Sequence, residues 1–214
     1  MMTVFPGAFA RSEVLMRTGC LLALLLLALP AAARDADFES AARGAERLDG
    51  LESFLAKYVG HCTDVYERQR CQANVAQARK AAAGRAFTVR VTDAAGLVRT
   101  QRRGGGFVVL LTPFVDGGGL ALTHGAPIRQ DAAGRPIVNL VPIPTALPEG
   151  MMEMEFESPF RTGAIDLEIV FRPEKVWKLS RRGEAGSYEG VAARFLAVRV
   201  LDARTGAPIA AKVL

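Results

Sequence analysis

The spacing of apolar residues predicts helices in the first third of the chain. From residue 36 to 58, apolar side chains recur every three or four positions, as on one face of a helix. They are Phe38, Ala41, Ala45, Leu48, Leu51, Leu55 and Tyr58. A second helical pattern runs through Val75, Ala78 and Ala82 and ends at Gly84, a residue type that commonly terminates helices. We therefore expect two antiparallel helices, a helical hairpin, over residues 34–84.

From residue 86 onward the apolar period changes to two, which is typical of strands. Glycine-rich segments separate the alternating stretches and indicate turns. The predicted strands cover residues 87–92, 97–102, 107–115, 120–123, 127–129, 137–141, 165–171, 176–179, 191–201 and 209–213. Many short strands with regular turns favour a sandwich or a barrel. The predicted fold class is α+β: an N-terminal helical hairpin, then an antiparallel β-sandwich or barrel-like β domain over residues 85–214.

Residues 151–157 have the sequence Met-Met-Glu-Met-Glu-Phe-Glu. Strict alternation predicts a half-buried strand with Met152, Met154 and Phe156 on one face and the glutamates on the other. Thioether groups also bind Cu(I) in exported proteins, so Met152 and Met154, with His124 as a third ligand, are candidate copper ligands. The half-buried strand is the favoured interpretation, because methionines are common in adaptable cores.

The N-terminus has the three parts of a secretory signal. Arg17 precedes the apolar run of residues 20–30, and three alanines at 31–33 precede a charged segment. The run is about half of the ~20 residues that a membrane-spanning helix needs. We expect a signal peptide over residues 1–33, with Met16 as an alternative start. The mature protein would be periplasmic or extracellular and not transmembrane.

After removal of the signal, two cysteines remain, Cys62 and Cys71. Outside the cytoplasm such a pair predicts a disulfide. Nine residues of continuous helix would separate the two Cα atoms by ~13.5 Å, beyond the ~7 Å limit of a disulfide. Pairing therefore requires the helix to break between them, and Gly60 offers a break just before Cys62. The alternative is a metal site that uses His61, Cys62 and Cys71.

Composition narrows the class of protein. The chain has 214 residues, of which 50% are hydrophobic and 23% charged, as in globular proteins. The net charge of +5 comes from basic residues scattered along the chain. Nucleic-acid-binding proteins usually carry a basic stripe or a recognisable motif. We find neither and expect no nucleic-acid partner.

Candidate catalytic residues are few. The chain has two histidines, His61 and His124, and none of the common nucleophile, nucleotide or metalloprotease motifs. The glycine runs 104–106 and 117–119 flank a predicted strand and do not open a helix, so they indicate turns and not phosphate loops. We assign no catalytic residue and no resident cofactor.

Several segments together resemble a family of exported bacterial proteins of unknown function. They are 54–62 (FLAKYVGHC), 71–74 (CQAN), 111–114 (LTPF), 119–127 (GLALTHGAP) and 170–177 (VFRPEKVW). The resemblance spans about residues 50–210. It implies export and the two-cysteine segment, and it supplies no activity, ligand or catalytic residue.

Three functions follow from this sequence. The first is an exported, non-enzymatic protein that binds a protein partner or an envelope component. The second is a periplasmic copper carrier that uses Met152, Met154 and His124. The third is a hydrolase whose site is assembled from residues dispersed along the chain, which only geometry reveals.

Overall fold

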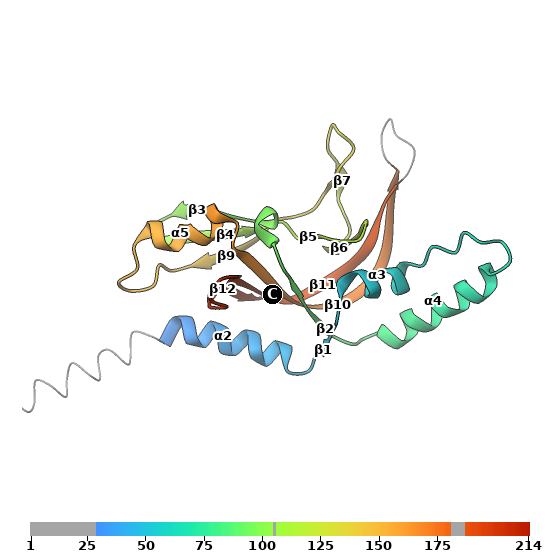
Figure 1. Cartoon of the computed structure of the whole chain (residues 1–214), viewed down its shortest axis with the longest axis horizontal. Helices are drawn as coiled ribbons and strands as arrows, with labels where there is room; N and C mark the ends of the chain where they lie inside the picture. The colour runs from blue at the N-terminus through green and yellow to red at the C-terminus, as the bar shows by residue number, and fades with distance from the viewer. Residues whose placement is uncertain (1–28, 105, 181–186) are drawn as a thin grey trace, which may run out of the picture.

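The computed structural model describes residues 29–104, 106–180 and 187–214 (Figure 1). Most of the predicted signal peptide therefore lies outside the described residues. Within these ranges the chain forms four α-helices, one 3-10 helix and twelve strands. The α+β class is thus confirmed. No helix among the described residues has both the length and the apolar character needed to cross a membrane.

The elements follow the chain in this order: α2 (Leu29–Ala42), β1 (Glu46–Arg47), α3 (Leu51–Val59), α4 (Arg68–Ala82), β2 (Phe87–Val91), η1 (Ala94–Leu97), β3 (Val98–Arg103), β4 (Gly106–Leu111), β5 (Phe114–Gly117), β6 (Leu120–His124), β7 (Arg129–Gln130), β8 (Pro136–Ile137), β9 (Val141–Thr145), α5 (Glu153–Thr162), β10 (Ile165–Ser180), β11 (Ser187–Asp202) and β12 (Pro208–Val213). Most predicted strands are present. The two predicted strands at 165–171 and 176–179 are one strand, β10, and the prediction at 107–115 is divided between β4 and β5 by Pro113.

Seven strands form the main sheet in the order β1-β2-β10-β11-β6-β5, with β12 also paired to β11. β1 pairs with β2 and β6 pairs with β11 in parallel, and the other pairs of this sheet are antiparallel. A second sheet has the order β3-β4-β9, and β7 and β8 form a small hairpin. The expectation of purely antiparallel sheets is therefore wrong, and the described strands do not close into a barrel.

The core lies between the two larger sheets. Alternate residues of β4 and β9 are buried, as the period of two predicts. Val109 and Ile143 from the second sheet belong to one apolar cluster with Leu167 and Ile169 of the main sheet. Leu55 of α3, which has no exposed surface, packs into the same cluster. Burial in this cluster fixes the position of α3, whereas α4 buries only its last residue.

α2 covers part of the opposite face of the main sheet. Phe38 packs there with Val170, Ala197 and Ala211. Its ring also lies 4.3 Å from the guanidinium carbon of Arg199 on β11. That largely buried guanidinium forms ion pairs with Asp35 (2.5 Å), Glu39 (2.7 Å) and Glu168 (2.6 Å). Burial by itself would lower the pKa of Arg199, but hydrogen bonds to the three carboxylates raise it above its ordinary value.

The predicted helix over residues 36–58 is interrupted, which corrects the two-helix hairpin. α2 ends at Ala42, and after a glycine the chain enters β1. The backbone N–H of Glu46 donates to the carbonyl of Ala86, and that of Leu48 donates to the carbonyl of Thr88. These bonds extend the main sheet and stop the helix, so the hairpin consists of α3 and α4 alone. The apolar period continues through the break because the segments on both sides face apolar clusters.

The predicted strand over residues 151–157 is wrong, because this segment begins α5. The backbone N–H of Met152 donates to the Glu155 carboxylate at 2.9 Å, as a capping box requires. Glutamates in a first turn also interact favourably with the helix dipole. Phe156 stacks on Phe107 with ring centroids 4.5 Å apart, and Glu153 pairs with Arg102 of β3. The alternation of Met and Glu therefore marks a helix start and not a strand.

Gly190 lies where β10, β11 and β6 meet. A Cβ atom there would collide with the carbonyl oxygen of Ala121 and lie 2.8 Å from the ring of Trp177. We expect Gly190→Ala to destabilise the protein by about 1–3 kcal/mol, because packed cores tolerate overpacking poorly. Urea unfolding measures the change. Gly44→Ala is the matched control, since its Cβ meets nothing within 4 Å. Equal stability of the two variants would contradict the prediction.

Candidate functional site

The hairpin of α3 and α4 is joined by the predicted disulfide. Cys62 lies in the segment between the helices and Cys71 in the first turn of α4, with the Cα atoms 5.6 Å apart. The expectation that the helix breaks between the cysteines is therefore confirmed. The disulfide removes both thiolates from the alternative metal site at His61, Cys62 and Cys71. Among the described residues no group of three or more His, Cys, Asp or Glu is placed to hold a metal ion.

Arg79 and Val75 hold α4 against the end of α3. The Arg79 side chain donates to the carbonyl oxygens of Tyr58 (2.8 Å) and Val59 (3.1 Å), which end α3. A cation at a helix C-terminus satisfies free carbonyls and the helix dipole together. Burial raises the pKa of the Tyr58 hydroxyl, and nearby Arg79 partly offsets that rise. Val75 lies so close to Gly60 that a Cβ atom there would collide with it. These contacts fix the angle between the helices.

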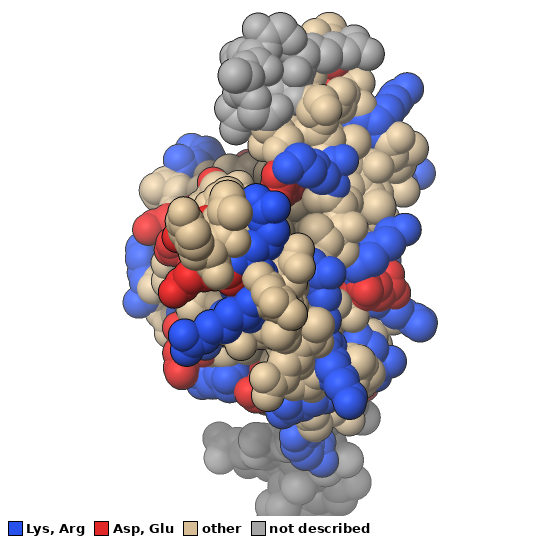
Figure 2. All heavy atoms as spheres, turned by 90° about the vertical axis from the view of Figure 1, so that its right-hand side faces the viewer, with Lys and Arg blue, Asp and Glu red and all other residues tan. Residues whose placement is uncertain are grey.

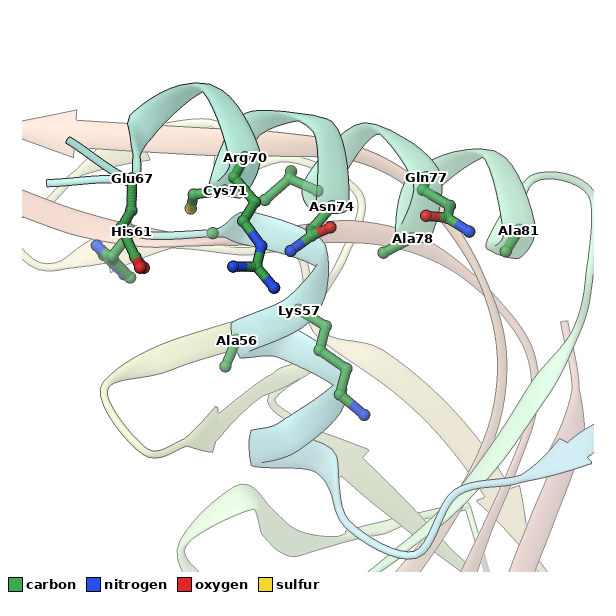
Figure 3. Close-up of a pocket in the computed structure, with 12 residues that line it drawn as sticks. Ala56, Lys57, His61, Glu67, Arg70, Cys71, Asn74, Gln77, Ala78 and Ala81 are labelled. Atoms are coloured by element: carbon green, nitrogen blue, oxygen red, sulfur yellow. The ribbon is translucent and has the colours of Figure 1, made fainter. Parts of the chain in front are cut away.

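A groove of about 860 Å³ lies between the two helices. Lys57 from α3 and Arg70, Asn74 and Gln77 from α4 line it. Figure 3 shows the Arg70 guanidinium and the Asn74 amide above the Lys57 stem, whose ammonium end points away from them. Neither Lys57 nor Arg70 forms an ion pair within the described part of the chain. Glu67 lines the groove near its His61 end. The helix walls therefore offer two cations, two amides and, near the His61 end, one carboxylate to a ligand.

A second hollow, of about 330 Å³, adjoins the groove and shares Ala56 and His61 with it. Its other wall is the β5–β6 turn at Gly117, Gly118 and Gly119. A Cβ atom would lie 2.7 Å from the Leu55 side chain if placed on Gly117, and 2.6 Å from the Glu52 carboxyl carbon on Gly118. These glycines thus form a turn, as predicted, and allow α3 to approach the sheet closely.

The second hollow is acidic, in contrast to the groove. Glu52 of α3 and Glu189 of β11 line it. A hydrogen bond from Lys178, then one from Ser187, lowers the pKa of Glu189, and the proximity of His61 contributes further. Glu189 is therefore ionised and already engaged. Glu52 has no ion-pair partner within the described ranges, so it is the free carboxylate of this hollow.

The structure does not bring the copper candidates together. His124 ends β6, where its Nδ1 accepts the backbone N–H of Phe195 at 3.0 Å and its ring lies 5.2 Å from the Phe195 ring. Met152 and Met154, 59% and 65% exposed, lie at the start of α5. That helix lies at the far end of the molecule from α3, beside β3, whereas β6 is central (Figure 1).

Sequence reasoning missed Lys57, Arg70, Asn74 and Glu52. One signal was present: residues 68–82 contain Arg68, Arg70, Arg79 and Lys80 but no Asp or Glu. This helix is mostly exposed, and its lack of acidic residues gives it an unusual concentration of positive charge. Figure 2 shows basic side chains spread over the face that carries α4, with smaller acidic groups among them. Only the fold shows which of these cations face the groove.

The chain belongs to a family of unknown function, DUF6066, whose model matches residues 16–213. No curated protein and no solved structure matches the chain. The family therefore supplies no activity, and inferences about function depend on the geometry of the site.

Loss of the disulfide should destabilise the hairpin and the fold. For a bridge that spans nine positions, the chain-entropy model gives about 2.7 kcal/mol. We expect the Cys62→Ser/Cys71→Ser variant to lose about this much stability in urea unfolding, whatever the redox conditions. The natural chain should lose the same amount only when a reductant is added. A variant as stable as the oxidised natural chain would contradict this prediction.

His124 should make stability depend on pH. Burial, outweighing the attraction of Glu174, lowers the pKa of His124, and the Phe195 N–H bond requires an unprotonated Nδ1. The unfolded chain takes up this proton below about pH 6.5. The contribution of neutral His124 to the free energy of unfolding is therefore complete above that pH. It is lost as the pH falls toward the lower pKa that His124 has in the folded protein.

His124→Asn supplies a similarly placed acceptor that does not titrate. Urea unfolding from pH 7 to 5 should show stability falling more steeply for the natural chain than for this variant. Because His61 is present in both proteins, the difference isolates His124. Parallel profiles would contradict the assignment.

Proposed function

We propose that the protein is exported, loses its signal peptide after Ala33, and binds an anionic ligand in the groove between α3 and α4 without catalysing a reaction. The observation that carries the proposal is the pair of free cations, Lys57 and Arg70, on facing helices that a disulfide joins. The final location is the periplasm or the extracellular space, as the N-terminal pattern predicts.

Two features support export. Disulfides persist in oxidising compartments and are rare in the cytosol. α2 contacts the sheet through Asp35, Phe38, Glu39, Ala41 and Ala42, all of which follow Ala33. Cleavage after Ala33 would therefore leave the docked part of α2 in place, which is what a processed mature N-terminus requires.

Several properties of the groove support anion binding. The planar guanidinium of Arg70 suits bidentate recognition of a carboxylate or phosphate, and Lys57 adds a point charge. The amides of Asn74 and Gln77 add neutral donors. Its volume of about 860 Å³ is within the usual range for ligand sites. Cys71 lines the groove only as part of the disulfide, so it offers no nucleophile. No contact among the described residues favours the copper or hydrolase hypotheses.

Intact mass spectrometry of protein recovered from the cell envelope tests export. We expect a chain that begins at Arg34 and whose mass is about 2 Da lower before reduction than after it, because oxidation of the two thiols removes two hydrogens. An uncleaved chain with free thiols would contradict export.

Titration with glutarate, a dicarboxylate, tests the groove. In NMR spectra of the mature protein, saturable shifts should centre on α3 and α4. Lys57→Gln/Arg70→Gln should weaken binding at least tenfold, because it removes both free cations. Arg68→Gln/Lys80→Gln makes the same charge change on α4 outside the groove lining and should change the affinity less than twofold. Equal losses in both variants would indicate general charge attraction and contradict a specific site.

A further inference from the structure

We infer that the groove and the second hollow form one site for a dipolar ligand, a short peptide with a carboxylate and an amine. The carboxylate would bind Lys57 and Arg70, and the amine would bind Glu52. This inference rests on the proposed function and specifies its ligand class.

The two hollows are contiguous. Both are lined by Ala56 and His61. Ala56 contributes only a methyl group, so no long side chain of α3 separates them at that position. The glycine turn at 117–119 presents backbone without side chains on the far wall. An extended chain can therefore lie across α3 from one hollow into the other.

Cations predominate in the groove, whereas the second hollow carries a free carboxylate. Lys57 and Arg70 line the groove, and Glu52 lines the second hollow beside Gly118. Glu189 is engaged by Lys178 and Ser187, so Glu52 is the carboxylate of the second hollow that can receive a cation, whereas Glu67 lines the groove itself beside Arg70. A simple anion would use one half of this arrangement, whereas a ligand with both charges uses both halves.

The neutral side chains favour a peptide over a simple zwitterion. Asn74 and Gln77 line the groove, and each amide carries donors and an acceptor. Backbone peptide groups also present one donor and one acceptor per residue, so they match these side chains. Sulfate and a bare phosphodiester group lack donors for the amide oxygens. The site chemistry therefore fits a peptide backbone between the two charged groups.

Oligoglycines of graded length test the inference, because each residue adds about 3.3–3.6 Å between the terminal charges. Tri-, tetra- and pentaglycine would be titrated into the mature protein and followed by NMR. Each would be used free, N-acetylated and C-amidated. At one or more of these lengths we expect the free peptide to bind at least tenfold more tightly than its acetylated form, which lacks the ammonium group.

Glu52→Gln should abolish this preference and leave the affinity for acetylated peptides unchanged. Asp49→Asn is the matched control, since it removes an exposed carboxylate just before α3 and outside both hollows. This variant should still prefer free peptides to acetylated ones. Lys57→Gln/Arg70→Gln should weaken the binding of every peptide that keeps its terminal carboxylate. Circular dichroism would verify that each variant is folded.

The outcomes separate the two proposals. If acetylated peptides bind through Lys57 and Arg70 but free peptides bind no more tightly, the dipolar site is wrong and the anion site stands. A preference for free peptides that survives Glu52→Gln also overturns the assignment of the amine. If neither free nor acetylated peptides bind, and glutarate does not bind, both proposals fail together.

Discussion

Pairing between β10 and β11 is the constraint on which the rest of the fold depends. The two strands are 16 residues long and pair from Ile165–Asp202 to Ser180–Ser187, with two register irregularities. β2 pairs with β10, and β12 and β6 pair with successive parts of β11. The same ribbon carries core residues on one face and, on the other, Arg199, which forms ion pairs with Asp35 and Glu39 of α2. These two long strands therefore fix the positions of elements that are distant in the sequence.

The candidate site exists because α3 and α4 are held by different forces. α3 is buried against the sheets through Leu51, Leu55 and Tyr58. α4 is polar and mostly exposed, so burial does not position it. The disulfide and the Arg79 side chain fix it instead. Local tethers in place of a packed interface leave an open groove that Lys57 and Arg70 line.

Sequence patterns succeeded where a single local rule governed the structure. Alternation identified β2 and most of β10, because along these segments each face of the strand keeps the same kind of environment. Spacing showed that Cys62 and Cys71 can pair only if the helix breaks between them, because a continuous helix would hold them too far apart for a disulfide. The same rules failed at residues 43–50, where pairing of β1 with β2 overrides the helical period. They also failed at Glu153–Glu155, where capping and packing of Phe156 on Phe107 override alternation.

The sequence by itself determined the α+β class and the turn at Gly117–Gly119, and it favoured the disulfide over a metal site, because each depends on the spacing of residues that are close in the chain. Tertiary structure alone decided the composition of the candidate site. Lys57 and Arg70 face one groove because α4 folds back on α3, and Glu52 meets the turn at Gly118 because β6 pairs in parallel with β11. The physical reason is that side chains from separate elements converge only after the sheet order and the helix packing are fixed, and no local pattern encodes that order.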